Sequence, residues 1–354
     1  MIALNCRFLT QDLTGVQRYA EEITRELVRI RDDVRLYAPR GDLRHHELGG
    51  RRVEQIGTTG GHRWEQWDLP RMLRRDLNSP LLLSLMNTGP VLYRNQVVTH
   101  HDVTYVRFPD TYTRRFRLAY RMLSGLALRR AERVVTVSEF SRSEIADVYG
   151  IDRQKIVVAG NAAGAEFRQT HVDADEPYLL AVASFLPHKN IDRLVRAFEQ
   201  YRDRSGSTTT LRLVGSARPA AMARSDGSPR SSDGVELLGR VDDEQLRDLY
   251  AGARAFIFPS LYEGFGVPPL EAQSAGTPVA AADIPPVREA LRDSALLFDP
   301  LDEEAIIAAI ETVDSDAGER ARLRAQGDLN VARYSWAESA GRVSALLDEL
   351  AEGR

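Results

Sequence analysis

The residues with the clearest chemical potential in this sequence are two glutamates that flank two glycines: Glu263, Gly264, Gly266 and Glu271. Glycine lets a ligand approach the backbone closely. We expect a helix to start directly after the glycines, with Glu271 in its first turn, and the N–H groups of a helix start favour an anion such as phosphate. The carboxylates could accept hydroxyl protons on either side of that phosphate. A nucleotide sugar carries hydroxyl groups on both sides of a diphosphate, so these residues predict a site for such a ligand. The alternative interpretation of this stretch is a plain strand-to-helix turn, which any α/β protein contains.

Two elements must hold this stretch in place. The apolar run over residues 255–258 predicts a short buried strand just before it. Pro268 or Pro269 suits the first turn of the following helix, because a missing N–H costs nothing there. Gly276 suits the end of that helix. The two glycines are therefore predicted to lie in a strand-to-helix loop.

A second group of candidate residues lies in the N-terminal half. Gly15 follows an expected first strand over residues 2–8 and precedes a helix, so its backbone could touch a ligand, or it could be an ordinary turn glycine. His101 and Asp102 follow an expected strand over residues 96–99, where an imidazole could face a substrate hydroxyl; a packing histidine is the alternative. The first strand is not followed by Gly-x-Gly-x-x-Gly, which argues against a dehydrogenase of the usual dinucleotide type.

Strands and helices alternate along both halves of the chain, and this pattern predicts two doubly wound α/β domains that face one another. We place the domains at residues 1–168 and 169–354, with the loose polar stretch 160–177 as the linker. The last helix, near residues 336–350, could cross back onto the N-terminal domain. The loop over residues 216–234 is rich in Ser, Gly, Pro and Asp; we interpret it as a surface insertion rather than a cover for the cleft.

The composition is that of an ordinary soluble globular protein, with 43% hydrophobic and 28% charged residues among 354. No apolar run approaches the roughly 20 residues that span a bilayer, and the N-terminus lacks the pattern of a signal peptide. We therefore expect a cytoplasmic protein, which could also lie at the inner face of the membrane as a peripheral protein. The single cysteine, Cys6, is expected to be a buried hydrophobe rather than a nucleophile.

The charges are distributed unevenly. Residues 1–170 carry 27 Lys and Arg against 20 Asp and Glu, whereas residues 171–354 carry 20 against 31. Residues 112–131 contain six arginines and no acid, and Arg114, Arg117 and Arg121 share one face of a predicted helix. This pattern suits an anionic membrane surface, but a core helix with a solvated arginine face is an equally open alternative. We do not expect nucleic acid binding, because the charges are not combined with aromatic platforms.

Several segments closely resemble the family-4 retaining glycosyltransferases, whose signature has two glutamates enclosing seven residues around Gly-Phe-Gly. The N-terminal segments look most like the mannosyltransferase B-like subgroup. The matching segments follow one another along this chain in the same order as in the family. They are Thr14-Gly15-Val16-Gln17-Arg18-Tyr19, Asn87-Thr88-Gly89-Pro90, His101-Asp102, residues 136–141, Pro187-His188-Lys189-Asn190 and Glu263 through Glu271. The resemblance implies a GT-B fold, with the nucleotide sugar mainly on the C-terminal domain and the acceptor on the N-terminal domain.

The resemblance also assigns roles to individual residues. Lys189 would hold the donor diphosphate, Glu263 and His101 would each bind a hydroxyl of the transferred sugar, and these three form the expected catalytic group. Glu271 would accept the ribose hydroxyls. The residues that the resemblance places around the donor are Gly15, Val16, Ser184, Lys189, Arg240, Val241, Glu263, Gly264, Phe265, Gly266, Val267 and Glu271.

One departure from the family pattern concerns the donor phosphates. Many relatives carry an arginine a few residues before the lysine, but here residues 183–188 read Ala-Ser-Phe-Leu-Pro-His. Arg218 and Arg240 are the candidates for the second phosphate-binding cation.

Together, these observations predict a retaining hexosyltransferase, with mannose as the expected sugar, that acts on a saccharide or lipid-linked saccharide in polysaccharide biosynthesis. We expect GDP-mannose as the donor, with a UDP-sugar as the alternative, and neither a cofactor nor a metal, since the family needs none. The rival functions are a GT-B sugar-nucleotide epimerase or hydrolase, and a catalytically idle sugar-binding protein.

Overall fold

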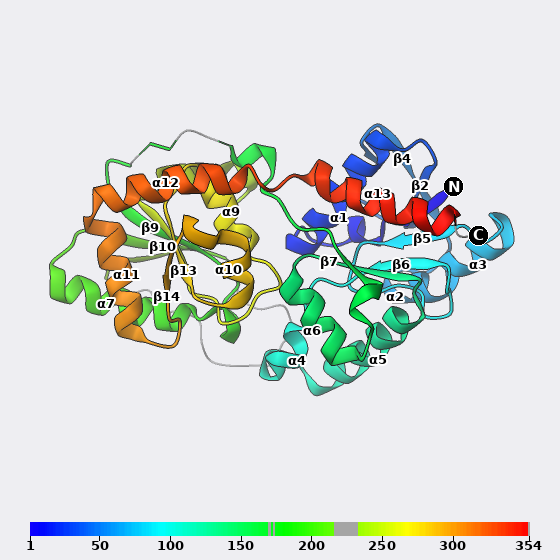
Figure 1. Ribbon diagram of the computed structural model, residues 1–354, viewed down its shortest axis with the longest axis horizontal. Helices are drawn as coiled ribbons and strands as arrows, with labels where there is room; N and C mark the ends of the chain where they lie inside the picture. The colour runs from blue at the N-terminus through cyan, green and yellow to red at the C-terminus, as the bar shows by residue number, and fades with distance from the viewer. Residues whose placement is uncertain (169–170, 173, 216–232, 353–354) are drawn as a thin grey trace. The chain divides into compact units, whose positions relative to one another are not determined.

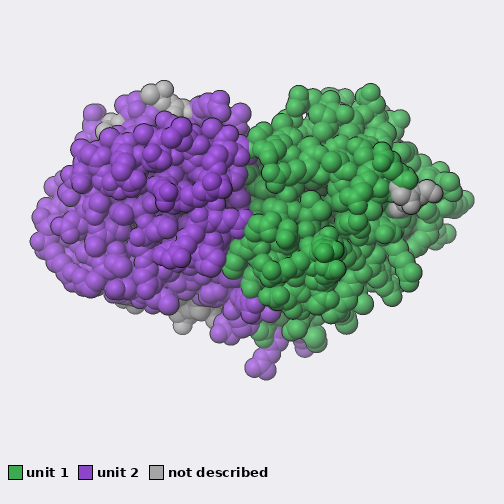
Figure 2. Space-filling view, viewed as in Figure 1, with its two compact units in different colours: residues 1–103, 117–161, 335–354 green, residues 104–116, 162–334 purple. Residues whose placement is uncertain are grey.

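The computed structural model describes residues 1–168, 171–172, 174–215 and 233–352, and the chain divides into two compact units (Figure 2). Unit 1 comprises Met1–Val103, Arg117–Asn161 and Ser335–Arg354, and unit 2 comprises Thr104–Phe116 and Ala162–Tyr334. The main change of unit thus falls after Asn161, somewhat before the expected boundary at residue 168. The C-terminal helix belongs to unit 1, and the short segment Thr104–Phe116 belongs to unit 2, which the sequence pattern had not indicated.

The sheet of unit 1 has the strand order β3-β4-β2-β1-β5-β6-β7-β8. Its strands pair in parallel except for the antiparallel pair β3–β4 at one edge, as far as the described residues go. The strands are β1 (Ile2–Asn5), β2 (Val34–Pro39), β3 (Glu47–Leu48), β4 (Arg51–Ile56), β5 (Leu81–Ser84), β6 (Gln96–Thr99), β7 (Arg133–Thr136) and β8 (Ile156–Val158).

The helices of unit 1 connect these strands, and α13 lies beside α1 (Figure 1). They are α1 (Gly15–Ile30), α2 (Gly61–Arg63), the π-helical turn Trp64–Asp68, α3 (Leu69–Asp76), α5 (Arg114–Arg130, whose residues up to Phe116 belong to unit 2), α6 (Glu139–Tyr149) and α13 (Trp336–Glu352). The expected amphipathic helix after Gly15 is confirmed, because Tyr19, Ile23 and Leu27 are fully buried on one face of α1.

The sheet of unit 2 has the order β11-β10-β9-β12-β13-β14, and its described strands pair in parallel. The strands are β9 (Tyr178–Val182), β10 (Thr210–Val214), β11 (Val235–Gly239), β12 (Ala255–Phe258), β13 (Val279–Ala282) and β14 (Leu296–Phe298). The helices are α4 (Thr104–Arg107), α7 (Ile191–Ser205), α8 (Asp243–Gly252), α9 (Val267–Ser274), α10 (Pro285–Leu291), α11 (Glu303–Ser315) and α12 (Ala317–Val331).

Strand β12 shows why the sheet of unit 2 needs helices on both faces. All four of its residues are buried, although successive side chains point to opposite sides of a sheet. Ala255 and Ile257 join the hydrophobic cluster that includes residues of α7 and α11. Phe256 packs instead against Tyr250 of α8, with ring centroids 5.4 Å apart, and α9 contacts β12 and β13. The apolar run over residues 255–258 is therefore a strand buried on both faces, as the sequence predicted.

Candidate functional site

The predicted donor residues lie at a topological switch point of the unit 2 sheet. The chain leaves β9 toward β10 and β11, then returns to form β12 on the other side of β9. In an open parallel sheet, ligands bind beyond the carboxyl ends of the strands at such a point. Lys189 follows β9 and Glu263 follows β12, so these two residues come from the two strands that flank the switch point.

Lys189 and Glu263 form an ion pair, with Lys189 Nζ 2.6 Å from Glu263 Oε1. The two side chains are 20% and 13% exposed, so they remain reachable by a ligand. The two loops that carry them are tied together, because the backbone N–H of Leu261 donates to the carbonyl of His188 at 2.7 Å. Asn190, in the left-handed region with φ 58°, also donates from Nδ2 to the carbonyl of Pro259 at 3.1 Å. The switch point thus holds a cation and a carboxylate in direct contact.

Gly266 shapes the start of α9. It has φ 104°, a conformation that costs residues with a Cβ atom, whereas a Cβ atom added at this position would lie 3.6 Å from its nearest neighbour. Glycine is therefore required here by backbone conformation rather than by space. The ring of Phe265 packs edge-on against Tyr334 at 5.5 Å, and the residue is 5% exposed, so its side chain takes part in packing. Val267 is the first residue of the helix, in agreement with the predicted strand-to-helix loop.

The expected position of Glu271 in the first helical turn is wrong. Because α9 begins at Val267, Glu271 is its fifth residue and lies in the second turn. Its side chain is nearly buried, at 6% exposure for the residue, and the hydroxyl of Tyr250 donates to Oε2 at 3.1 Å. Glu271 is thus an acceptor held in place by α8, and it does not complement the charge of the helix start. Sequence patterns missed Tyr250, because its position on α8 gives no local signal.

The remaining predicted donor residues follow the carboxyl ends of the same sheet. Ser184 lies just after β9 and is half-buried. Arg240 is exposed and Val241 is half-buried, and both follow the edge strand β11. Gly264, between Glu263 and Phe265, is buried. Arg218, the other candidate for the second phosphate-binding cation, and most of the loop 216–234 lie outside the described residues.

Phe108 is an aromatic neighbour of the Lys189–Glu263 pair that the sequence did not indicate. It belongs to the segment Thr104–Phe116 of unit 2. Its ring centroid lies 5.7 Å from that of His188 and 5.8 Å from that of Tyr262. These two residues precede Lys189 and Glu263 directly, so Phe108 packs against both loops of the candidate site. A single phenylalanine far away in sequence carries no pattern that could have revealed this contact.

In unit 1, His101 is held just beyond the carboxyl end of β6. Its backbone N–H donates to Asn87 Oδ1 at 2.7 Å, and its ring meets Tyr19 edge-on at 4.9 Å. Nε2 lies 3.2 Å from the carbonyl of Leu85, which can only accept, so Nε2 carries the proton. Burial lowers the pKa of His101, which favours the neutral ring. Nδ1 has no hydrogen-bond partner in the described part of the chain. It is also not one of the unpaired polar atoms that are fully enclosed there, so it is accessible. His101 can therefore accept a hydroxyl proton at Nδ1.

Gly15 is the first residue of α1, and Val16 follows it, half-buried. Gly15 is exposed, its φ lies outside the left-handed region, and a Cβ atom built on it would meet no atom within 4 Å. Neither packing nor backbone conformation requires a glycine here. The close ligand approach at Gly15 therefore stays a prediction.

The basic helix is confirmed as α5, but its faces differ from the predicted ones. Arg114 and Arg121 are exposed, whereas Arg117 is half-buried. The exposed face also carries Leu118, Met122 and Leu126, whose exposures are 72%, 62% and 39%. The outward surface of α5 is therefore apolar as well as basic.

Two further features concern the whole of the described chain. No helix within it is long and apolar enough to cross a membrane. No group of three or more His, Cys, Asp or Glu side chains in the same ranges could hold a metal ion.

The chain is similar in sequence to known glycosyltransferases. Residues 13–164 match the family model described as Glycosyltransferase Family 4, and residues 163–329 match the one described as Glycosyl transferases group 1. The chain is 32% identical over 254 residues to the O-antigen chain mannosyltransferase RfbU of Salmonella typhimurium, which covers 71% of this chain and 69% of the relative. It is 31% identical over 267 residues to the O-antigen chain mannosyltransferase B of Escherichia coli, which covers 70% of each chain.

The fold is also that of solved glycosyltransferases. Sucrose-phosphate synthase from Thermosynechococcus elongatus superposes with a TM-score of 0.77 at 20% identity, over 100% of this chain and 99% of the other. WaaG, described as a glycosyltransferase involved in lipopolysaccharide biosynthesis, gives a TM-score of 0.72 at 14% identity, over 98% and 99% of the two chains. The sequence relationship and the two parallel-sheet units lead to one conclusion: this chain is a glycosyltransferase of the GT-B fold and belongs to glycosyltransferase family 4.

Proposed function

We propose that this enzyme transfers mannose from GDP-mannose to a saccharide or lipid-linked saccharide, with retention of the anomeric configuration. The observation that carries the proposal is the contact between Lys189 and Glu263 at the switch point of the unit 2 sheet. A diphosphate needs the cation, and a sugar hydroxyl needs the carboxylate. The choice of mannose rests on the relatives, two of which are described as O-antigen chain mannosyltransferases.

The residues of unit 2 would act on the departing diphosphate. Lys189 and the backbone N–H groups at the start of α9 would stabilise the charge that develops on the leaving oxygen. Glu263 would hold a hydroxyl of the transferred sugar, and Glu271, fixed by Tyr250, would accept the ribose hydroxyls. In a retaining transfer without an enzyme nucleophile, the departing phosphate would help to deprotonate the incoming hydroxyl on the same face.

A donor screen followed by a transfer assay tests this function. GDP-mannose should raise the melting temperature more than UDP-glucose, UDP-galactose or GDP-fucose, since only the true donor binds the folded state strongly. The enzyme should then release GDP rapidly only when a mannose-terminated oligosaccharide is present, and NMR of the product should show an α-linkage. Equal GDP release without an acceptor would favour the hydrolase or epimerase. No turnover with any donor would favour an idle sugar-binding protein.

A further part of the proposal is that the enzyme docks on the cytoplasmic face of an anionic membrane through α5. The inward side of this helix is packed, since Ser124 Oγ donates to the carbonyl of Asn87 at 3.3 Å. The outward side carries Leu118, Met122 and Leu126, one helical turn apart from each other, with Arg114 and Arg121 nearby. Because residues 112–131 contain no acid, an anionic lipid surface complements this face better than a neutral one.

Co-sedimentation with vesicles tests the docking. Binding should require phosphatidylglycerol, and Arg114→Gln with Arg121→Gln should weaken it about thirtyfold, at about 1 kcal/mol for each arginine near an anionic surface. Leu118→Ser with Met122→Ser should also weaken it. Leu329→Ser, at a comparably exposed leucine of α12, is the matched control and should have no effect. Equal binding to vesicles of pure phosphatidylcholine would refute the docking surface.

A further inference from the structure

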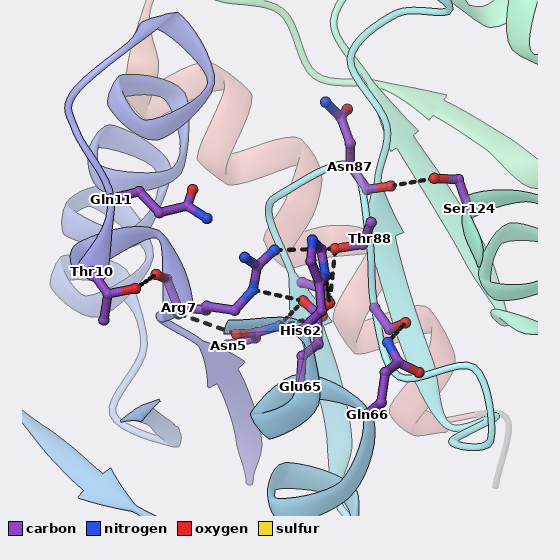
Figure 3. A network of polar contacts seen from close by, with 12 residues as sticks. Asn5, Arg7, Thr10, Gln11, His62, Glu65, Gln66, Asn87, Thr88 and Ser124 are labelled. Atoms are coloured by element: carbon purple, nitrogen blue, oxygen red, sulfur yellow. Dashed lines mark hydrogen bonds and ion pairs between the residues drawn. The ribbon is translucent and has the colours of Figure 1, made fainter. Parts of the chain in front are cut away.

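A buried polar cluster lies at the switch point of the other sheet, in unit 1 (Figure 3). The chain passes from β1 to β2 on one side and later returns to form β5 on the other side of β1. Arg7 follows β1 and Thr88 follows β5, so both lie where an open parallel sheet binds its ligands. Gly15 and Val16, two of the expected donor residues, also follow β1, but none of the expected donor residues belongs to this cluster.

Glu65 is the centre of the cluster and is fully buried. Its Oε1 accepts from Arg7 Nε at 3.3 Å and from Asn5 Nδ2 at 3.0 Å. Its Oε2 accepts from Thr88 Oγ1 at 2.8 Å and lies 3.1 Å from Nδ1 of His62. Burial alone would raise the pKa of Glu65, but these partners, above all the guanidinium of Arg7, lower it to about 2. The carboxylate is therefore ionised and balances the charge of Arg7.

Glu65 lies in the π-helical turn Trp64–Asp68, which precedes α3. Such turns are rare, and they occur frequently at functional sites. The turn is anchored by Trp64, whose Nε1 donates to the carbonyl of Ile56 at 2.9 Å. The backbone thus departs from a regular helix at the residue that organises the cluster.

Two nitrogen atoms of the cluster have no hydrogen-bond partner within the described ranges. Arg7 uses Nε for Glu65 and Nη2 for Thr88, at 3.2 Å, which leaves Nη1. The Arg7 side chain is only 4% exposed. Its Nη1 atom is not one of the unpaired polar atoms that are fully enclosed, so Nη1 belongs to the small part of the side chain that remains exposed. His62, with a side chain 50% exposed, donates from Nδ1 because a carboxylate only accepts, so the neutral form of the ring presents Nε2 as an acceptor. A donor and an acceptor, both fixed by Glu65, are therefore open to a ligand.

We propose that Arg7 Nη1 and His62 Nε2 form a subsite for two hydroxyl groups of the acceptor saccharide. This inference rests on the proposed function of the enzyme. A sugar hydroxyl both donates and accepts, so two hydroxyls of one saccharide match a donor and an acceptor whose side chains contact the same carboxylate. A phosphate fits less well, because Glu65 neutralises Arg7 and His62 presents an acceptor.

A purely structural role for the cluster is the alternative. A buried ion pair is a weak source of stability, because apolar residues of similar volume often stabilise a fold equally well. The cluster differs from a closed structural pair because Arg7 keeps an unused donor at the exposed side. The geometry therefore favours a function in binding over a function in stability alone.

Saccharide binding measured by saturation-transfer NMR and by calorimetry tests the subsite without requiring transfer. The probes are methyl α-mannopyranoside and α-linked mannobiose. Arg7→Lys keeps the ion pair with Glu65 but removes Nη1, the guanidinium nitrogen that has no partner in the cluster. His62→Ala alters an exposed side chain. Each variant should weaken probe binding about tenfold or more, as expected for a lost hydrogen bond to a fixed group.

Arg31→Lys is the matched control, because Arg31 also pairs with carboxylates in unit 1 but precedes β2 at the opposite end of the sheet. It should bind the probes within twofold of the wild type. In the transfer assay, Arg7→Lys and His62→Ala should raise the acceptor KM and leave the donor KM within twofold. Unchanged probe binding in both variants, or no probe binding by the wild type, would overturn the subsite. Loss of transfer by the wild type with probe binding intact would instead overturn the proposed function.

Discussion

Replacing Glu263 with glutamine should strengthen the binding of GDP while it abolishes sugar transfer. Lys189 Nζ lies 2.6 Å from Glu263 Oε1. A diphosphate must take Lys189 away from this partner, and the carboxylate is then left close to a second anion. Glutamine has nearly the same shape but no charge, so GDP would no longer compete for the lysine. Transfer should fail because the neutral amide oxygen of glutamine holds the sugar hydroxyl more weakly than the carboxylate does.

The size of the effect follows from the geometry of the pair. Two charges at this distance attract by about 6 kcal/mol at an effective dielectric constant of about 20, before the cost of removing both from water. The side chains are 20% and 13% exposed, so desolvation and lost side-chain freedom offset most of the attraction. A net value of about 1 to 2 kcal/mol, between that of an ordinary hydrogen bond and the upper values for charged groups, is expected for such a partly exposed pair. The Kd for GDP should therefore fall about five- to thirtyfold.

Isothermal titration calorimetry with GDP measures this change directly. Glu319→Gln provides a matched control, because Glu319 pairs with Arg322 at the same distance, 2.6 Å, on α12 of the same unit. That variant should bind GDP like the wild type. Lys189→Ala should bind GDP more weakly than the wild type. If Glu263→Gln left the GDP affinity unchanged or lowered it, the idea that the ion pair competes with the diphosphate would be refuted.

The two glycines of the site should respond differently to alanine. Gly266→Ala should lower the free energy of unfolding by about 1 to 2 kcal/mol, because its φ of 104° strains any Cβ-bearing residue. Gly15→Ala should leave stability unchanged, since no atom lies within 4 Å of the added methyl group, yet reduce transfer; full activity would contradict a ligand contact there. Stability should also depend on pH through His100, whose pKa burial lowers from 6.5 to about 4. The unfolded chain binds this proton more readily, so the free energy of unfolding, measured by urea denaturation, should fall by about 3 kcal/mol between pH 6.5 and pH 4. The variant His100→Gln should lose this part of the pH dependence. Identical slopes for His100→Gln and the wild type would contradict the assignment.

Much of the fold was predictable because its elements have local causes. The apolar run over residues 255–258 is a strand, the helix after Gly15 has its apolar stripe buried, and the terminal helices fall where the pattern indicates. Gly266 could be recognised in advance as well, because its role depends on backbone conformation at one residue. The error over Glu271 arose at a helix boundary, where a shift of one or two residues changes which turn a side chain occupies.

The sequence by itself determined the chemical inventory: a lysine, two carboxylates and a glycine loop in the order of a known family, and a helix rich in arginine. Tertiary structure alone decided which of these groups meet. Lys189 contacts Glu263 because β9 and β12 are neighbours in a sheet that their order along the chain does not reveal. Phe108 and the cluster around Arg7 and Glu65 depend on contacts between residues far apart in the chain. Such contacts leave no periodic signal, since hydrophobic patterning records which face of an element is buried and not what it is buried against.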